Sequence, residues 1–225
     1  MKTNTFLLIM LLLLLAIGLP SQTLPKIQQG MIGGLNIANF SGDDIEDLDD
    51  AGFTINNRTL FHLGLTGTTN ITSNLDLRGE IALSMNGSKW KVNLDVATPE
   101  AFDTVPFTIT HTMYMIQAPV SLILNFPLPN SAVKPYLGAG LSASIPVSSS
   151  WEISALGEDE EGDYTDEEFA ELSSFVIGYQ LNLGLDFNKI LCEFRYERGL
   201  TPVFDNSDID ETFYSNFKFL VGFRF

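Results

Sequence analysis

The sequence predicts an all-β fold, an eight-stranded antiparallel up-and-down transmembrane β-barrel, on three observations. Large apolar residues alternate with small or polar residues along eight segments, which is the period of a β-strand. The connections between these segments alternate between short and long. The apolar faces are nearly free of charge, whereas the polar faces carry charges of both signs. No segment beyond residue 21 has a 3.6-residue apolar period, so no helix is indicated there.

The beginning of the chain has the features of an export signal. Lys2 precedes an apolar run over residues 6–19, and the small residue Ser21 follows it. We expect residues 1–21 to be a signal peptide, because the run is shorter than the ~20 residues of a membrane-spanning helix. Residues 22–225 have the length of one domain. Cys192 is the only cysteine, so neither an internal disulfide nor a lipid-modified cysteine after the apolar run is indicated.

The composition excludes one class of partner. The formal net charge is -16 at pH 7. A chain this acidic lacks the basic surface that binds phosphate backbones, so we expect no nucleic-acid partner.

The predicted strands follow from the alternation in order. They lie near 27–40, 57–67, 75–85, 108–126, 133–146, 173–187, 190–198 and 212–225. The fourth contains Pro119, which cannot donate a ladder hydrogen bond, and we expect a bulge or kink there.

The connections sort into two kinds. "TGTTNITSN", "FPLPNSA" and "FNK" are short, whereas "SGDDIEDLDDAG", residues 86–107, "VSSSWEISALGEDEEGDYTDEEFAEL" and "GLTPVFDNSDID" are long. Eight up-and-down strands with both termini at one end produce four long loops at the other end. Most of the 28 acidic residues fall in these long connections, and the remaining five are Asp76, Glu80, Asp186, Glu193 and Glu197.

One hairpin allows its register to be predicted. If Asn188-Lys189 is a two-residue turn, Asn182 lies opposite Arg195 and Gln180 lies opposite Glu197. Polar residues then face polar residues across the hairpin, as one shared face requires.

The polar faces indicate which side of the barrel is the inside. They combine ionised side chains of both signs with glycine, serine and asparagine, a composition that suits a narrow lumen, whereas a charge-free outer surface suits lipid. We therefore predict a polar lumen network of His62, Asp76, Arg78, Glu80, Asp186, Glu193, Arg195, Glu197, Lys218 and Arg224. A soluble ligand-binding barrel, with its apolar face inward, is the alternative.

No catalytic, cofactor-binding or metal-binding residue is assigned. The chain has two histidines, and we expect His62 in the lumen network and His111 near the outer rim of a strand. The acidic runs could hold a divalent ion weakly, but they lack the spacing of a calcium loop and are expected to be solvated. An eight-stranded barrel is about filled by its own side chains, so an open pore is not expected.

Four stretches carry a family resemblance. They are "GMIGGLNIANFSGDD", "IQAPVSLILNF", "KPYLGAGLSASI" and the closing "FKFLVGFRF". The chain resembles the Bacteroidetes-type outer membrane β-barrel domain family, also called the porin family, with PorT-like proteins among its members and a wider similarity to OmpA- and OmpX-like barrels. The resemblance implies an outer membrane β-barrel domain over 22–225, periplasmic termini and contact with outer-membrane lipid and lipopolysaccharide. The last strand ends in an alternating apolar motif that looks like the signal recognised by the barrel assembly machinery. Its residues are Phe217, Phe219, Val221, Phe223 and Phe225.

Three functions remain open from the sequence. The leading expectation is a non-enzymatic surface barrel with a structural, adhesive or secretion-accessory role and a surface or secretion-system protein as partner. A narrow porin-like channel for small solutes or ions is the second. A membrane-embedded lipid hydrolase using His62 is the third. No cofactor is expected for any of them.

Overall fold

The computed structural model describes residues 26–50, 52–97, 102–155, 158–163, 171–205 and 212–225. The signal peptide expected at 1–21 lies outside these residues. In the described part of the chain, no helix has both the length and the apolar character needed to cross a membrane.

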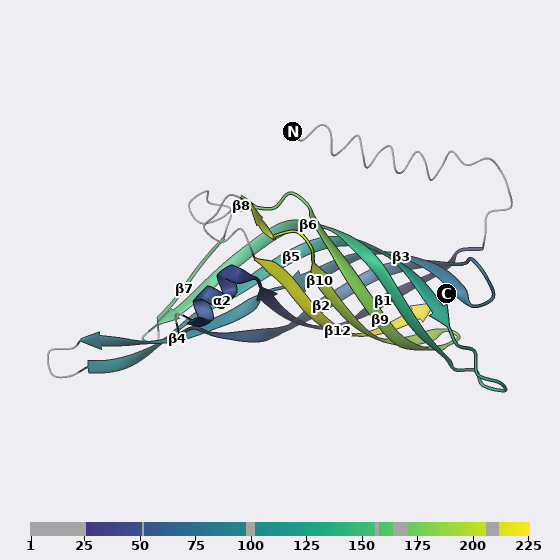
Figure 1. The fold of residues 1–225 in the computed structure, drawn as a ribbon, viewed down its shortest axis with the longest axis horizontal. Coiled ribbons are helices and arrows are strands. Elements are labelled where there is room, and N and C mark those ends of the chain that lie inside the picture. The colour runs from purple at the N-terminus through teal and green to yellow at the C-terminus, as the bar shows by residue number, and fades with distance from the viewer. Residues whose placement is uncertain (1–25, 51, 98–101, 156–157, 164–170, 206–211) are drawn as a thin grey trace.

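Eight antiparallel strands close into a ring (Figure 1). They are β1 (Gln28–Ser41), β2 (Thr54–Asn70), β3 (Leu75–Asn86), β5 (Phe102–Asn125), β6 (Lys134–Ala155), β9 (Val176–Phe187), β10 (Ile190–Gly199) and β12 (Phe213–Arg224). Each strand pairs with its neighbours in the ring, and β12 returns to pair with β1, as in the pair Leu35–Phe219. The predicted eight-stranded up-and-down barrel is therefore confirmed.

Strand alternation separates a lipid-facing wall from an interior. Along β12 the burial alternates, so that Phe217, Phe219 and Val221 are exposed while Lys218 and Leu220 are buried. All eight strands of the ring expose large apolar side chains, for example Leu35, Leu63, Ile81, Val120, Leu141, Leu183, Ile190 and Phe219. This charge-poor belt is the surface that a transmembrane barrel presents to hydrocarbon.

The two ends of the barrel differ. Short turns join β2 to β3, β5 to β6 and β9 to β10, and β1 starts and β12 ends beside them, so we call this the short-turn end. The opposite, long-loop end carries the remaining connections (Figure 1). In the Asn188-Lys189 turn, Asn188 has φ +71°, and Asn182 lies opposite Arg195, so the predicted hairpin register is confirmed.

The region 86–107 was predicted to be a long loop, and that prediction is wrong. It forms strand β4 (Ser88–Ala97) and the start of β5, which pair from Lys89–Thr110 to Ala97–Phe102. β3 and β4 keep one register on β5 across Gly87, since Asn86 pairs with Met113 and Lys89 with Thr110. β4 is thus the continuation of β3: Ser88–Lys91 still pair with β2 inside the ring, and the rest of β4 pairs with β5 alone.

The third and first long connections also contain regular structure. β6 continues to Ala155 and pairs with β7 (Glu158–Asp163), so β4, β5, β6 and β7 form a four-stranded extension at the long-loop end. β8 (Glu171–Leu172) pairs with β11 (Phe204–Asp205) in a separate sheet. The helix α2 (Asp43–Asp50) contradicts the expectation that no helix would form. Its Ile45 is buried, and Asp43 at its start suits the helix dipole.

A bulge or kink was expected at Pro119; the register does not shift there, but the pairing of β3 with β5 is interrupted at Pro119 and Ala118. Pro119 pairs with Ser142 in regular register, and the irregularity between β5 and β6 lies at Tyr114/Met115. On the other side, the pairs Gly79–Val120 and Ala82–Gln117 belong to one register. The barrel therefore accommodates the missing N–H of Pro119 without shifting the strands.

Candidate functional site: a closed lumen

Seven titratable side chains meet in the middle of the lumen. They are His62 from β2, Arg78 and Glu80 from β3, Glu193, Arg195 and Glu197 from β10, and Lys218 from β12, and we call them the ion network. All seven are buried, and Arg195 and Lys218 are 0% exposed. Three cations stand against three carboxylates, so the network is balanced when His62 is neutral.

Arg195 lies at the centre of one half of the ion network. Its Nη2 is 2.9 Å from Glu80 Oε2 and its Nε is 2.8 Å from Glu193 Oε1. Arg78 donates to the other oxygen of Glu193 at 2.5 Å and stacks over the ring of Tyr136, whose hydroxyl also donates to Glu193 at 2.7 Å. Buried charged groups require such pairing with opposite charges; Arg78 Nε is the buried nitrogen of this half without a hydrogen-bond partner among the described residues.

Lys218 is the centre of the other half. Its Nζ is 2.5 Å from Glu197 Oε2 and 2.9 Å from Gln117 Oε1. Glu197 Oε1 accepts further hydrogen bonds from Gln117, Ser142 and Tyr214. Lys218 Nζ and Glu197 Oε1 thus each have several partners, and Glu197 Oε2 is paired with Lys218.

His62 links the two halves. Its Nδ1 is 3.3 Å from Lys218 Nζ, and its Nε2 is 2.6 Å from Glu80 Oε1. An ammonium group can only donate, so Nδ1 accepts and the proton lies on Nε2, which donates to Glu80. This geometry fits a neutral imidazole used as a structural bridge.

The other three residues of the predicted lumen set lie apart, at the short-turn end. Arg224 Nη1 is 2.5 Å from Asp186 Oδ2, and Arg224 is half-buried. Asp76 accepts from Asn70 at 2.5 Å and from Asn125 at 2.8 Å. The structure therefore brings seven of the ten residues into one network and places three at the rim.

Sequence reasoning missed a second layer, toward the long-loop end. Buried apolar side chains form the mouth cluster of Phe40, Ile45, Trp90, Met113, Met115, Val176, Val203, Phe204 and Tyr214. Ile45 comes from α2 and Trp90 from β4, so two elements that were predicted as loops supply it. The Tyr214 hydroxyl donates to Glu197 at 2.9 Å, which places the cluster directly on the ion network.

His111 lies toward the long-loop end, where it was expected, and its side chain is buried beside the mouth cluster. Its ring centroid is 4.1 Å from that of Trp90. His111 lies beyond Tyr114, where the exposed apolar belt of β5 stops among the described residues. Burial, with a smaller effect of the Arg58 charge, lowers the pKa of His111 to about 4, so the ring is neutral at physiological pH.

The surroundings of His62 do not resemble the site of a hydrolase. The ring nitrogens of His62 contact Glu80 and Lys218, and the side chain is 2% exposed, so a substrate cannot reach it in this state. Among the described residues, no three His, Cys, Asp or Glu side chains are grouped as metal ligands.

The alternating apolar residues at the end of the chain face outward. Phe217, Phe219, Val221, Phe223 and Phe225 are all exposed, and the Phe225 N–H donates to Gln29 O at 3.1 Å. Their role as an assembly signal stays a prediction.

Fold and lumen together define a membrane β-barrel whose interior is filled by its own side chains. The family model described as "Outer membrane protein beta-barrel domain" matches residues 21–205, and the chain belongs to this family. The protein is therefore an outer-membrane barrel. Its membership of a Bacteroidetes-type PorT-like subgroup stays a prediction.

Several solved structures are similar at low identity. Neisserial surface protein A is 16% identical, with 88% of this chain and 97% of that chain covered and a TM-score of 0.43. Ail, the attachment invasion locus protein of Yersinia pestis, is 11% identical, with 88% and 98% covered and a TM-score of 0.43. OprG from Pseudomonas aeruginosa is 12% identical, with 89% and 97% covered and a TM-score of 0.35. No curated protein matches the chain.

Proposed function

We propose that this protein is a non-enzymatic, non-conducting outer-membrane barrel that acts by binding a protein partner at its long-loop end. The observation that carries the proposal is the filling of the lumen at two successive levels. The ion network occupies the middle, and the mouth cluster occupies the side toward the long loops. With the interior occupied, the outer surfaces are left to carry the function.

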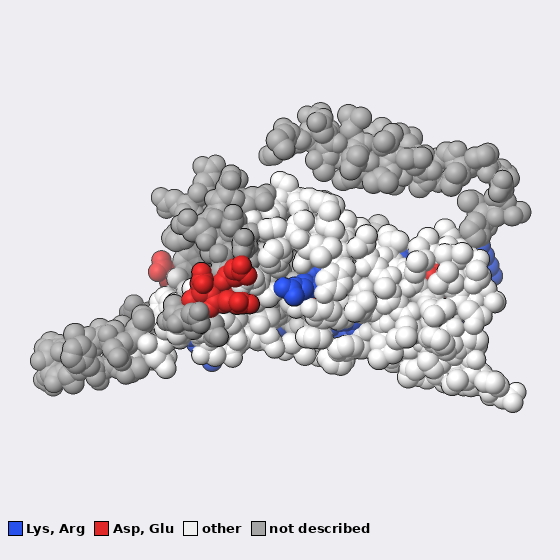
Figure 2. All heavy atoms as spheres, in the orientation of Figure 1, with Lys and Arg blue, Asp and Glu red and all other residues white. Residues whose placement is uncertain are grey.

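The long-loop end offers a built surface. The four-stranded extension and α2 lie there, and α2 exposes Asp43, Glu46 and Asp47. Figure 2 shows a cluster of acidic side chains at this end, while most of the barrel wall is uncharged. A partner with a basic surface complements such charges, which act mainly by steering association and by excluding wrong partners.

The proposal includes an orientation. The long-loop end faces the cell exterior, both termini are periplasmic, and residues 1–21 are an export signal. Adhesion and accessory function in secretion, as for PorT-like proteins, are the two roles that suit this arrangement.

Electrical recording tests the closed lumen. We expect purified barrel in planar lipid bilayers to give no steady conductance above that of a protein-free membrane, because an ion would have to displace buried, paired charges. Heat-unfolded protein in the same detergent is the control for leakage. A steady conductance that scales with the amount of inserted barrel would overturn this part of the proposal and favour the narrow channel.

Crosslinking from intact cells tests the protein partner. With an affinity tag inserted between residues 164 and 170, we expect one partner to be recovered in stoichiometric amount. Replacing Asp43, Glu46 and Asp47 by lysine should lower that recovery at least fivefold, because it reverses the exposed charge of α2. The control is Lys134→Glu, a single charge reversal of opposite sign on an exposed residue at the short-turn end. Recovery of the barrel alone, or equal recovery from both variants, would contradict a partner at this surface.

The hydrolase alternative has a simple test. His62→Gln should leave any lipid-directed activity of cell extracts unchanged. A loss of such activity, with the barrel still folded, would restore the enzyme hypothesis.

A further inference from the structure

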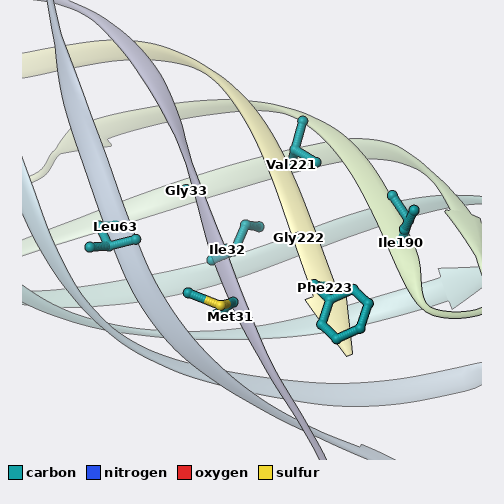
Figure 3. Close-up of a pocket in the computed structure, with 8 residues that line it drawn as sticks. All are labelled: Met31, Ile32, Gly33, Leu63, Ile190, Val221, Gly222 and Phe223. Carbon is teal, nitrogen blue, oxygen red and sulfur yellow. The ribbon is translucent and has the colours of Figure 1, made fainter. Parts of the chain in front are cut away.

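A groove crosses the lipid-facing wall near the short-turn end. Its volume is about 360 Å³, within the ~300–1,000 Å³ of small-ligand sites. Four strands of the ring contribute, with Leu63 from β2, Met31 and Gly33 from β1, Val221 from β12 and Ile190 from β10 (Figure 3).

The groove exists because a glycine occupies an outward-facing position of β1. Gly33 pairs with Leu63 on one side and Val221 on the other. Figure 3 shows these two side chains flanking a bare stretch of β1, with Met31 and Phe223 toward the strand end. A Cβ on Gly33 would lie 3.1 Å from Leu63 Cδ1 and 3.2 Å from His62 O, so any larger residue would narrow the groove.

The environment of the groove decides what class of molecule fills it. Its walls belong to the apolar belt, with Leu63 59% and Val221 60% exposed. In an outer-membrane barrel this belt contacts hydrocarbon, so water cannot occupy the groove and an alkyl chain can.

The groove leads to a cationic rim. At this end of the groove, Phe223 is followed in the chain by Arg224, and Ile190 is preceded by Lys189. The Arg224 N–H donates to Lys189 O at 2.7 Å. Lys189 is exposed, as is Lys26 just before β1. Among the side chains of the described residues at this rim, the carboxylates are Asp76 and Asp186, and both are buried and hydrogen-bonded. The exposed charged side chain next to the groove is therefore the cationic Lys189.

We propose that this groove is a binding site for one membrane glycerophospholipid. One acyl chain lies over Gly33 between Leu63 and Val221, and the phosphate lies against Lys189, which directly precedes the lining residue Ile190. The apolar slot and the cationic rim match the two parts of such a lipid at the same time. The site is independent of the protein partner proposed above, because it lies at the other end of the barrel.

Native mass spectrometry of the folded, detergent-purified barrel with added phosphatidylglycerol tests the site. We expect one lipid to stay bound to the unaltered protein. Gly33→Leu, which fills the groove, should lower the bound fraction at least tenfold, and Lys189→Glu should lower it at least fivefold. Gly79→Leu is the matched control, because Gly79 is another ring glycine outside the groove, and its Cβ would have no atom within 4 Å.

A second variant distinguishes loss of the groove from misfolding of the Gly33→Leu barrel. Leu63→Trp narrows the groove from its other wall without touching the β1 backbone, and it should lower lipid retention as Gly33→Leu does. Equal retention by the unaltered protein, Gly33→Leu and Leu63→Trp would show non-selective coating of the wall and overturn the site. Preferential retention of lipid A over phosphatidylglycerol would overturn the assignment to a glycerophospholipid.

Discussion

Replacing Arg195 by methionine should destabilise the barrel by about 3 to 5 kcal/mol, the usual cost of leaving buried charges without their partner. Arg195 is fully buried and is the shared partner of Glu80 and Glu193. Methionine keeps the apolar stem but removes the donors, so Glu80 loses its charged partner and retains only the hydrogen bond from the neutral His62. The free energy of unfolding, from urea titration of the barrel in lipid vesicles, measures the effect.

The rim provides a matched control for Arg195. Arg224→Met removes an arginine of equal size from Asp186, but the Arg224 side chain is 11% exposed, whereas that of Arg195 is 0% exposed, and Asp186 also accepts the Asn188 N–H at 2.8 Å. We expect a smaller loss there, about 1.5 to 3 kcal/mol, because Asp186 keeps a hydrogen bond and some contact with water. Adding Glu80→Gln to Arg195→Met should restore part of the lost stability, because it removes one orphaned charge. A loss from Arg195→Met no greater than that from Arg224→Met would mean that water reaches the network.

Replacing Gly184 by alanine should cost about 3 kcal/mol, from overpacking and from weakening a hydrogen bond to a charged group. Gly184 lies opposite Tyr136 in the β6–β9 pairing, and the Tyr136 ring covers it. A Cβ there would lie 2.6 Å from Tyr136 Cε1 and closer still to the hydroxyl end of the ring. The ring cannot move away freely, because its hydroxyl donates to Glu193 and its face holds Arg78.

A methyl group on the outer wall serves as the control for Gly184. Gly79→Ala adds the same atom where nothing lies within 4 Å, and its stability should stay within about 0.5 kcal/mol of the unaltered protein. The double variant Gly184→Ala/Tyr136→Ser should lose less than the sum of the two single changes, because the clash disappears with the ring. Unfolding at the same urea concentration for Gly184→Ala and Gly79→Ala would show that the ring is not fixed.

The face of each residue could be predicted because strand geometry leaves only two choices. A side chain points either to lipid or to the lumen, and neighbouring residues alternate between the two. One charged residue, which must face the lumen, therefore determines the face of every other residue in its strand. Glu193, Arg195 and Glu197 show this, since each alternates with an outward residue of β10. The hairpin at Asn188-Lys189 could be predicted for a related reason, because a two-residue turn fixes the register of both strands.

The errors fell where loops were inferred from length and charge. "KWKVNLDV", residues 89–96, alternates as clearly as the ring strands do, but eight other segments are enough to close a barrel, so alternation alone does not show that this segment extends the wall. α2 was missed because its short run has only Ile45 and Leu48 as apolar residues, too few to define a helical period. Both elements contribute to the mouth cluster, so that cluster was missed with them.

The sequence by itself determined the eight ring strands, the side of the wall on which each charged residue lies, and the end that carries the long loops. The tertiary structure alone decided which charges meet. Arg195 and Glu80 are 115 residues apart, and their strands are not neighbours in the ring. Closure of the barrel and the stagger of its strands set the height of each side chain in the lumen, and residue alternation carries no information about that height. For the same reason, only the closed ring shows that the lumen is filled and that Gly33 opens a groove beside a cationic rim.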